Sequence, residues 1–188
     1  MNNIKPINFL IPVIALILVS ILYFSLLKKA TDKKTFYRFI FTTTVLSFLL
    51  NFAWELIQIP FYKNPSYNID HIAFCALASL ADVIMVLLLY FGFALIFRNL
   101  LWIEHLNWKR IIIVILIGGT GAALAEIRHL SLGTWAYADS MPIIPIVNVG
   151  ISPVLQFMIL PLLIYLFSLY RLKIIGLKKT HNRYYESK

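Results

Sequence analysis

The chain has 188 residues, of which 61% are hydrophobic and only 13% are charged. Soluble domains average about 45–50% apolar and about 25% charged residues, so this chain has more apolar surface than one water-facing core can hide. We therefore expect a membrane protein. This excludes a secreted domain, an intrinsically disordered chain and a soluble nucleic-acid-binding protein, in spite of a net charge of +9. The single cysteine, Cys75, allows no disulfide within the chain.

Five apolar segments remain when the chain is divided at its charged and turn-forming residues. Each is close to the roughly 20 residues that cross a bilayer as an α-helix. The first segment is too long for a signal peptide and lacks a cleavage site. The sequence therefore predicts an all-α polytopic membrane protein, a bundle of about five transmembrane helices in a single domain over residues 1–188. The expected spans are Ile7 to Leu27, Phe39 to Ile59, Ile72 to Phe97, Ile111 to Ile127, and Val147 to Tyr170.

Lysine and arginine are distributed unequally between the two sides of the predicted bundle. If the N-terminus is outside, the outer side carries only Lys5, Lys63 and Arg128. All other basic residues then fall in inner loops or in the segment 171–188. Because positive loops are retained in the cytoplasm, we expect an N-out/C-in protein of a bacterial-type plasma (inner) membrane. Residues 171–188 are expected to form a basic cytoplasmic tail that contacts anionic headgroups and no nucleic acid.

Polar residues inside the spans are the main functional signal. A carboxylate at membrane depth is costly and persists only when it is paired, protonated or useful, and there are three: Glu55, Asp82 and Glu126. Helical spacing places the polar residues of each span on one face, and at about 1.5 Å per residue these faces share the outer half of the bilayer. We expect a polar pocket that opens toward the outer leaflet, with an inner half that is almost purely apolar. The faces carry Asn51, Trp54, Glu55 and Gln58 in the second span, His71, Cys75, Ser79 and Asp82 in the third, and Asn148, Ser152 and Gln156 in the fifth.

Small residues in the fourth span predict close helix packing. Between Gly118 and Ala125 they recur four residues apart, which lets transmembrane backbones touch, so we expect this stretch, including Gly121, to pack against another helix. A phosphate-binding loop is disfavoured because no strand precedes the glycines. At the outer end we expect Glu126 almost at the surface, in an ion pair with Arg128.

The connection after the fourth span, residues 129–146, contains Trp135 and Tyr137. It is typical of an interfacial aromatic belt, and it is also suited to act as a lid over the pocket.

The sequence contains only weak signals for a metal site or for a catalytic nucleophile. Glu126 and His129 have the spacing of a Glu-x-x-His pair, which His71 and Asp82 could complete, but a single short motif is a weak signal. We expect no metal and no cofactor. The serines lack the setting of an activated nucleophile, and Cys75 lies in apolar surroundings.

Three functions remain open. The favoured one is an enzyme that uses acid/base chemistry on a lipid-soluble, isoprenoid-like or other lipid substrate, with Asp82 as the acid, Glu55 as its partner and Glu126 as a third catalytic carboxyl. The alternatives are a structural or assembly subunit and a proton- or cation-coupled transporter. Interhelical polar contacts average well under about 1 kcal/mol, so three carboxyls exceed what packing needs, and five spans do not divide into two inverted halves. Substrate contacts are expected from Asn51, Trp54, Gln58, Ser79, Trp135, Tyr137 and Gln156.

Overall fold

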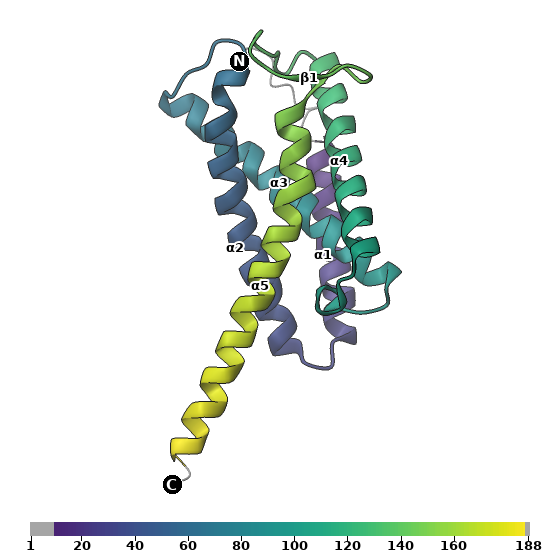
Figure 1. Ribbon diagram of the computed structural model, residues 1–188, viewed down its shortest axis with the longest axis vertical. Helices are drawn as coiled ribbons and strands as arrows, with labels where there is room; N and C mark the ends of the chain where they lie inside the picture. Colours follow the sequence, from purple (N-terminus) through teal and green to yellow (C-terminus); the bar gives the residue numbers. More distant parts are fainter. Residues whose placement is uncertain (1–9, 187–188) are drawn as a thin grey trace.

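Five long helices make up most of the computed structural model, which describes residues 10–186 and, within the last helix, side chains only as far as residue 174. Each of the five is long and apolar enough to cross a membrane, so the predicted all-α architecture with five such helices is confirmed (Figure 1). Two short strands, Ile143–Ile144 (β1) and Val149–Gly150 (β2), pair in antiparallel register with Ile143 opposite Gly150. The helices are Leu10–Lys29 (α1), Lys33–Gln58 (α2), Ile69–Ile96 (α3), Trp108–Ser131 (α4) and Ile151–Glu186 (α5).

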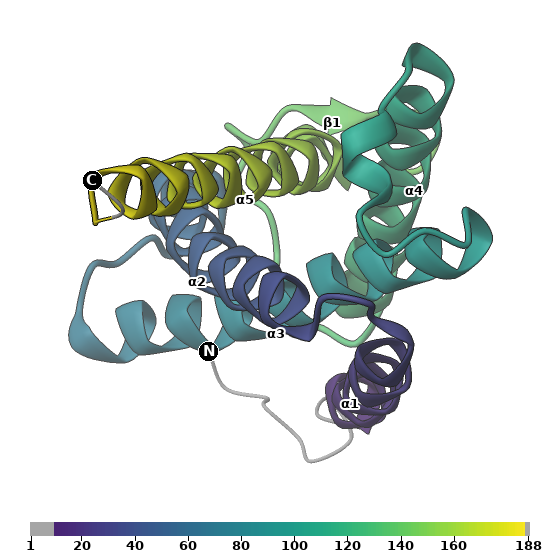
Figure 2. The ribbon, with the colours of Figure 1, turned by 90° about the horizontal axis from the view of Figure 1, so that it is seen from below.

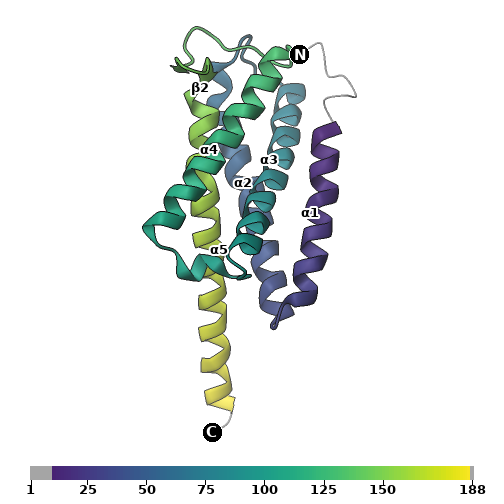
Figure 3. The same cartoon turned by 90° about the vertical axis from the view of Figure 1, so that its right-hand side faces the viewer.

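Successive helices run in alternating directions, so the connections gather at two ends of the bundle. The upper end in Figure 1 holds the α2–α3 connection, residues 59–68, and the α4–α5 connection, residues 132–150. The lower end holds residues 30–32 and 97–107, and α5 continues beyond it (Figures 1 and 3). Seen from below, α1 lies at the edge of the bundle (Figure 2). The helices α2, α3, α4 and α5 are therefore the ones that can enclose a site at the upper end.

Helix ends differ from the expected spans for local reasons. Asp32, Asn68 and Asn107 cap α2, α3 and α4, each accepting from the backbone N–H three residues further on, at 3.0, 2.9 and 3.0 Å. These caps start each helix before its apolar run begins. By contrast, α5 starts later than expected because Asn148 has φ 53° and the next two residues form β2. Residues 7–9 of the first expected span, and most of the expected basic tail, lie outside the part of the chain whose side chains are described.

An aromatic core holds the lower half of the bundle together. Tyr90, Trp102 and Tyr165 are fully buried, with the Tyr90 ring centroid 5.7 Å from that of Trp102 and 5.3 Å from that of Tyr165. Their polar atoms are satisfied, since Tyr165 Oη donates to the Val86 carbonyl at 2.7 Å and Trp102 Nε1 to the Tyr90 carbonyl at 3.2 Å. Large rings with paired polar tips fix α3 and α5 relative to each other.

The contact between α4 and α5 depends on two glycines. A Cβ at Gly118 would overlap the backbone carbonyl of Phe157, and one at Gly119 would lie 2.8 Å from Met158 Cγ. A Cβ at Gly121 would have nothing within 4 Å. The expected packing of the small-residue stripe is thus confirmed at Gly118 and Gly119 and is wrong for Gly121, which the rotation of the helix turns away from α5.

Candidate polar site at the upper end of the bundle

Gln156 on α5 connects the polar faces of three helices. Its Nε2 donates to Asn51 Oδ1 of α2 at 2.8 Å and to Asp82 Oδ2 of α3 at 3.1 Å. Gln156 and Asn51 are each only 1% exposed. Because lipid offers no partner for these groups, the polar faces of α2, α3 and α5 turn toward one another.

A second set of hydrogen bonds, nearer the upper end, surrounds Glu55 on α2. Gln58 Nε2 donates to Glu55 Oε1 at 2.9 Å, and Gln58 Oε1 accepts from Ser152 Oγ of α5, also at 2.9 Å. Ser152 Oγ in turn accepts from Trp54 Nε1 at 3.3 Å. The site thus contains two carboxyls, each held by a neutral amide that is itself tied to a neighbouring helix.

Glu126 on α4 is held by the α4–α5 connection. It is 6% exposed, and its Oε2 accepts from Trp135 Nε1 at 3.2 Å and from the Tyr137 hydroxyl. The structure shows no ion pair between Glu126 and Arg128, so the expected surface ion pair is wrong. The reason is that the connection folds back over the end of α4 and buries the carboxyl under aromatic side chains that donate to it.

Backbone pairing joins the two upper connections directly above the carboxyls. Tyr62 and Tyr137 form an antiparallel bridge, flanked by hydrogen bonds from Lys63 N to the Ala136 carbonyl and from Ala138 N to the Phe61 carbonyl, both at 2.9 Å. The two tyrosine ring centroids are 5.5 Å apart. We call residues 60–63 together with 135–140 the cap, because these segments cover the site from the upper end.

Tyr62 is a site residue that the sequence did not indicate. Its pKa is raised above the usual range, chiefly because burial disfavours the phenolate and further because Glu126, Glu55 and Asp82 lie near its hydroxyl. The Tyr62 hydroxyl is therefore subject to the electrostatic influence of all three carboxyls. Tyr62 lies in a connection, where no helical periodicity marks it, and its pairing with Tyr137 is visible only in three dimensions.

One oxygen of each carboxyl receives no hydrogen bond from the described protein. The protein donates to Glu55 Oε1, Asp82 Oδ2 and Glu126 Oε2 and leaves the other oxygen of each without a donor. Among the described residues, Ser47 Oγ is the one buried side-chain polar atom that lacks a hydrogen-bond partner. The second oxygen of each carboxyl is not among such fully buried atoms, so it keeps some accessible area. These oxygens are the atoms that can meet a ligand or exchange a proton.

Ser79, an expected substrate contact, and His129, considered only as a metal ligand, take no part in this network. Ser79 is fully buried, but its hydroxyl donates to the Cys75 carbonyl of its own helix at 2.7 Å. His129 stacks on Trp135 with centroids 4.3 Å apart. Over the described residues, no three His, Cys, Asp or Glu side chains are grouped as metal ligands would be.

A polar seam between α2 and α5 continues below the site. Thr43 Oγ1 donates to Ser168 Oγ at 3.0 Å, and both residues are fully buried, as is Ser47. The expectation that the other half of the bundle is almost purely apolar is therefore wrong along this seam. The four-residue spacing of Thr43, Ser47 and Asn51 is the signal in the sequence that indicates it.

Comparisons of the chain with protein-family models, curated proteins and solved structures find no match. The side chains that meet in the site are therefore the remaining indication of function. These are three carboxyls from α2, α3 and α4, the amides of Gln58 and Gln156 and the aromatic residues of the cap.

Proposed function

We propose that the protein is a membrane enzyme that uses acid/base chemistry on a lipid-soluble substrate. The observation that carries this proposal is that three carboxyls from three helices each have one oxygen held by a neutral donor and one oxygen without a hydrogen bond. A carboxyl that serves only to join helices is expected to have both oxygens paired. A general acid or base needs one oxygen free to reach the substrate.

The three carboxyls have different roles in this proposal. Asp82, fixed by Gln156, gives a proton to the substrate through its free oxygen, and Glu55, fixed by Gln58, receives a proton from it. Glu126 on α4 is held by the cap through Trp135 and Tyr137, and in this proposal its other oxygen serves the same substrate. The rings of Trp54, Trp135 and Tyr137 can stabilise positive charge that develops on the substrate.

The substrate class follows from the surroundings of the site. The cap covers the upper end, and the outward faces of the helices are apolar, so in this proposal the substrate enters sideways from the bilayer. A lipid with a polar or unsaturated end, such as an isoprenoid, places that end among the carboxyls and leaves its hydrocarbon chain in the membrane.

We further propose an N-out/C-in orientation in a plasma membrane of bacterial type. The described basic residues of 28–38 and 98–110 lie at the lower end, which favours that end as the cytoplasmic one. The site then lies in the outer half of the bilayer.

The test compares lipid extracts from cells that express the wild type, Asp82→Asn or Glu55→Gln. Either variant keeps an acceptor for its amide partner, so folding should survive, while the product seen with the wild type should fall by about 100-fold or more. Asp70→Asn is the matched control, because Asp70 is an exposed carboxyl in the first turn of α3. Mass spectrometry of the extracts and thermal unfolding of the purified proteins provide the two readouts.

Other outcomes would favour the alternative functions. Identical extracts from the wild type and an empty vector, with Asp82→Leu losing stability, would favour a structural or assembly subunit. Proton flux into proteoliposomes that disappears in Asp82→Asn would favour a transporter.

A further inference from the structure

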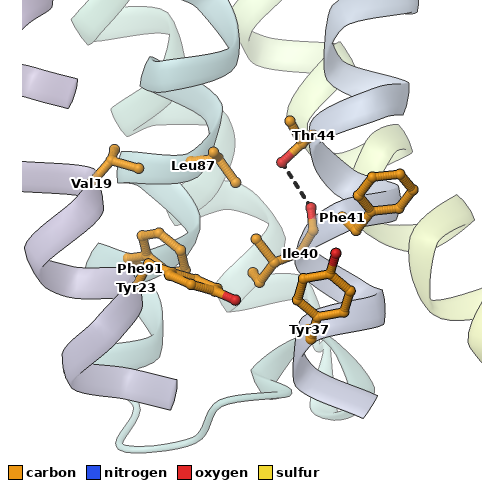
Figure 4. A pocket seen from close by; sticks show the side chains of 8 residues that line it. All are labelled: Val19, Tyr23, Tyr37, Ile40, Phe41, Thr44, Leu87 and Phe91. Carbon is orange, nitrogen blue, oxygen red and sulfur yellow. Dashed lines mark hydrogen bonds between the residues drawn. The ribbon is translucent and has the colours of Figure 1, made fainter. Parts of the chain in front are cut away.

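A lateral groove opens between α1, α2 and α3 in the lower half of the bundle, away from the carboxyl site (Figure 4). Its volume is about 230 Å³. The lining is apolar and aromatic and comes from all three helices: Val19, Tyr23, Tyr37, Ile40, Phe41, Thr44, Leu87 and Phe91.

The groove is elongated along the helices, and its two tyrosines lie toward the lower end. From Tyr37 to Thr44 the lining follows α2 for seven residues, or about 10 Å. The one hydrogen bond among the lining residues runs from Thr44 Oγ1 to the Ile40 carbonyl at 2.9 Å, so the hydroxyls of Tyr23 and Tyr37 donate to no other lining residue (Figure 4). Tyr37 is 55% exposed. An apolar slot that runs along the helices, with two phenols in its lower part whose hydroxyls point into it, suits a hydrocarbon chain (Figure 4).

Positive charge lies next to the lower edge of the groove. Lys33 and Lys34 lie in the first turn of α2, Arg38 directly follows Tyr37, and Lys28 and Lys29 end α1. The acidic residue of this region, Asp32, is occupied by Thr35, whose N–H and hydroxyl donate to its carboxylate at 3.0 and 2.7 Å. This cluster faces the headgroup region of a bilayer, where it attracts anionic lipid.

We propose that the groove binds one anionic phospholipid. One acyl chain lies along Val19, Thr44 and Leu87, and the phosphate contacts the basic residues at the start of α2. The phenols of Tyr23 and Tyr37 donate to the ester and phosphate oxygens between them. This site is separate from the carboxyl site, and the proposal stands whether or not the chain is an enzyme.

The test is native mass spectrometry of the full chain in detergent, with phosphatidylglycerol or phosphatidylcholine of identical acyl chains added. We expect one phosphatidylglycerol retained per chain in preference to phosphatidylcholine. Removing three charges in Lys33→Gln/Lys34→Gln/Arg38→Gln should lower that preference by about tenfold or more. Lys109→Gln, which removes a basic residue at the same end but on α4, is the control.

A second pair of variants tests the groove itself. Thr44→Trp fills the groove and should abolish retention of both lipids, while Thr42→Trp, on the same helix but outside the groove, should retain phosphatidylglycerol. Thermal unfolding identifies any variant that fails to fold. Equal retention of the two lipids by the wild type, or retention that Thr44→Trp leaves intact, would overturn the proposal. So would a dimer that Thr44→Trp dissociates, because the groove would then bind a second copy of the chain.

Discussion

Glu126 illustrates how single side chains define the site. Trp135 and Tyr137 both donate to its Oε2, so Oε2 acts as an acceptor and Oε1 is the atom that remains free. Neutral donors orient the carboxyl without the neutralising charge that an arginine would bring. The same division between a held and a free oxygen recurs at Glu55 and Asp82, whose donors are amides.

Tyr62 gives a prediction about pH. Because the folded-state pKa of Tyr62 lies above the unfolded value of about 10, unfolded chains lose this proton first as the pH rises. The resulting stability is fully present below pH 10 and is lost progressively above it. Tyr62→Phe should therefore show a shallower loss of thermal stability between pH 10 and 12 than the wild type. Unfolding in detergent measures this, with Tyr67→Phe, which removes an exposed phenol, as the control; equal slopes for the wild type and Tyr62→Phe would contradict the assignment.

Residues on helices were easier to predict from the sequence than residues in connections. The spacing of Asn51, Glu55 and Gln58 follows one helical face, and the structure brings them to Gln156 and Ser152. Nothing in the sequence reports that the connection after α4 folds back onto Glu126. The sequence suggested a lid from this connection, but its pairing with residues 60–63 depends on backbone geometry and leaves no side-chain periodicity that could indicate it.

At the contact between α4 and α5, a glycine of α4 faces a backbone carbonyl of α5 that has lost its usual hydrogen-bond donor. Pro161 lies inside α5 and has no N–H, so the Phe157 carbonyl loses its usual partner one turn away. Gly118 of α4 faces that carbonyl. A glycine there lets the α4 backbone approach a polar group that would otherwise face an apolar side chain.

Gly118→Ala should destabilise the protein by about 1–3 kcal/mol, because its Cβ overlaps backbone atoms that cannot move aside easily. Gly121→Ala is the matched control. It meets open space and gains up to about 1 kcal/mol from helix propensity. Thermal unfolding of the two variants in the same detergent measures the difference. A Gly121→Ala protein that is the less stable of the two would show that α4 is rotated relative to the structure.

Hydropathy gave the number of helices correctly, but not their ends or their rotation. The apolar runs ignore the caps at Asp32, Asn68 and Asn107, which extend helices into the polar boundary. Small residues four apart indicated a packing face, yet a Cβ built on Gly118 or Gly119 would meet α5 and one built on Gly121 would not. Only the position of α5 decides which of them is in contact.

At the scale of the whole molecule, the two halves of the bundle differ in what holds them together. The lower half has the aromatic core around Trp102, and the upper half has hydrogen bonds among carboxyls and amides under the cap. Aromatic packing fixes the helices where no chemistry is proposed. The rigid lower half can therefore support a polar upper half whose contacts are individually weak.

The alternating helices give a prediction for orientation. Reporter fusions after Lys34, Lys63, Leu106, Asp139 and Lys188 should lie inside, outside, inside, outside and inside, because basic residues concentrate at the lower end. An alkaline phosphatase and a fluorescent-protein reporter at each position measure complementary sides. The reverse pattern at every position would invert the orientation, and two adjacent fusions on the same side would remove a span.

The position of α5 has a consequence for biosynthesis. Glu55 and Asp82 leave the ribosome on α2 and α3, whereas Gln156 and Ser152 arrive only with the last span. Until α5 is inserted, Asp82 lacks the Gln156 amide that holds it, and Glu55 has only Gln58 of its own helix as a donor. Insertion of the last helix therefore completes the hydrogen bonds between α5 and the polar residues of α2 and α3. A chain that stops before α5 would leave Asp82 without its amide partner at membrane depth, where an unpaired carboxylate is costly.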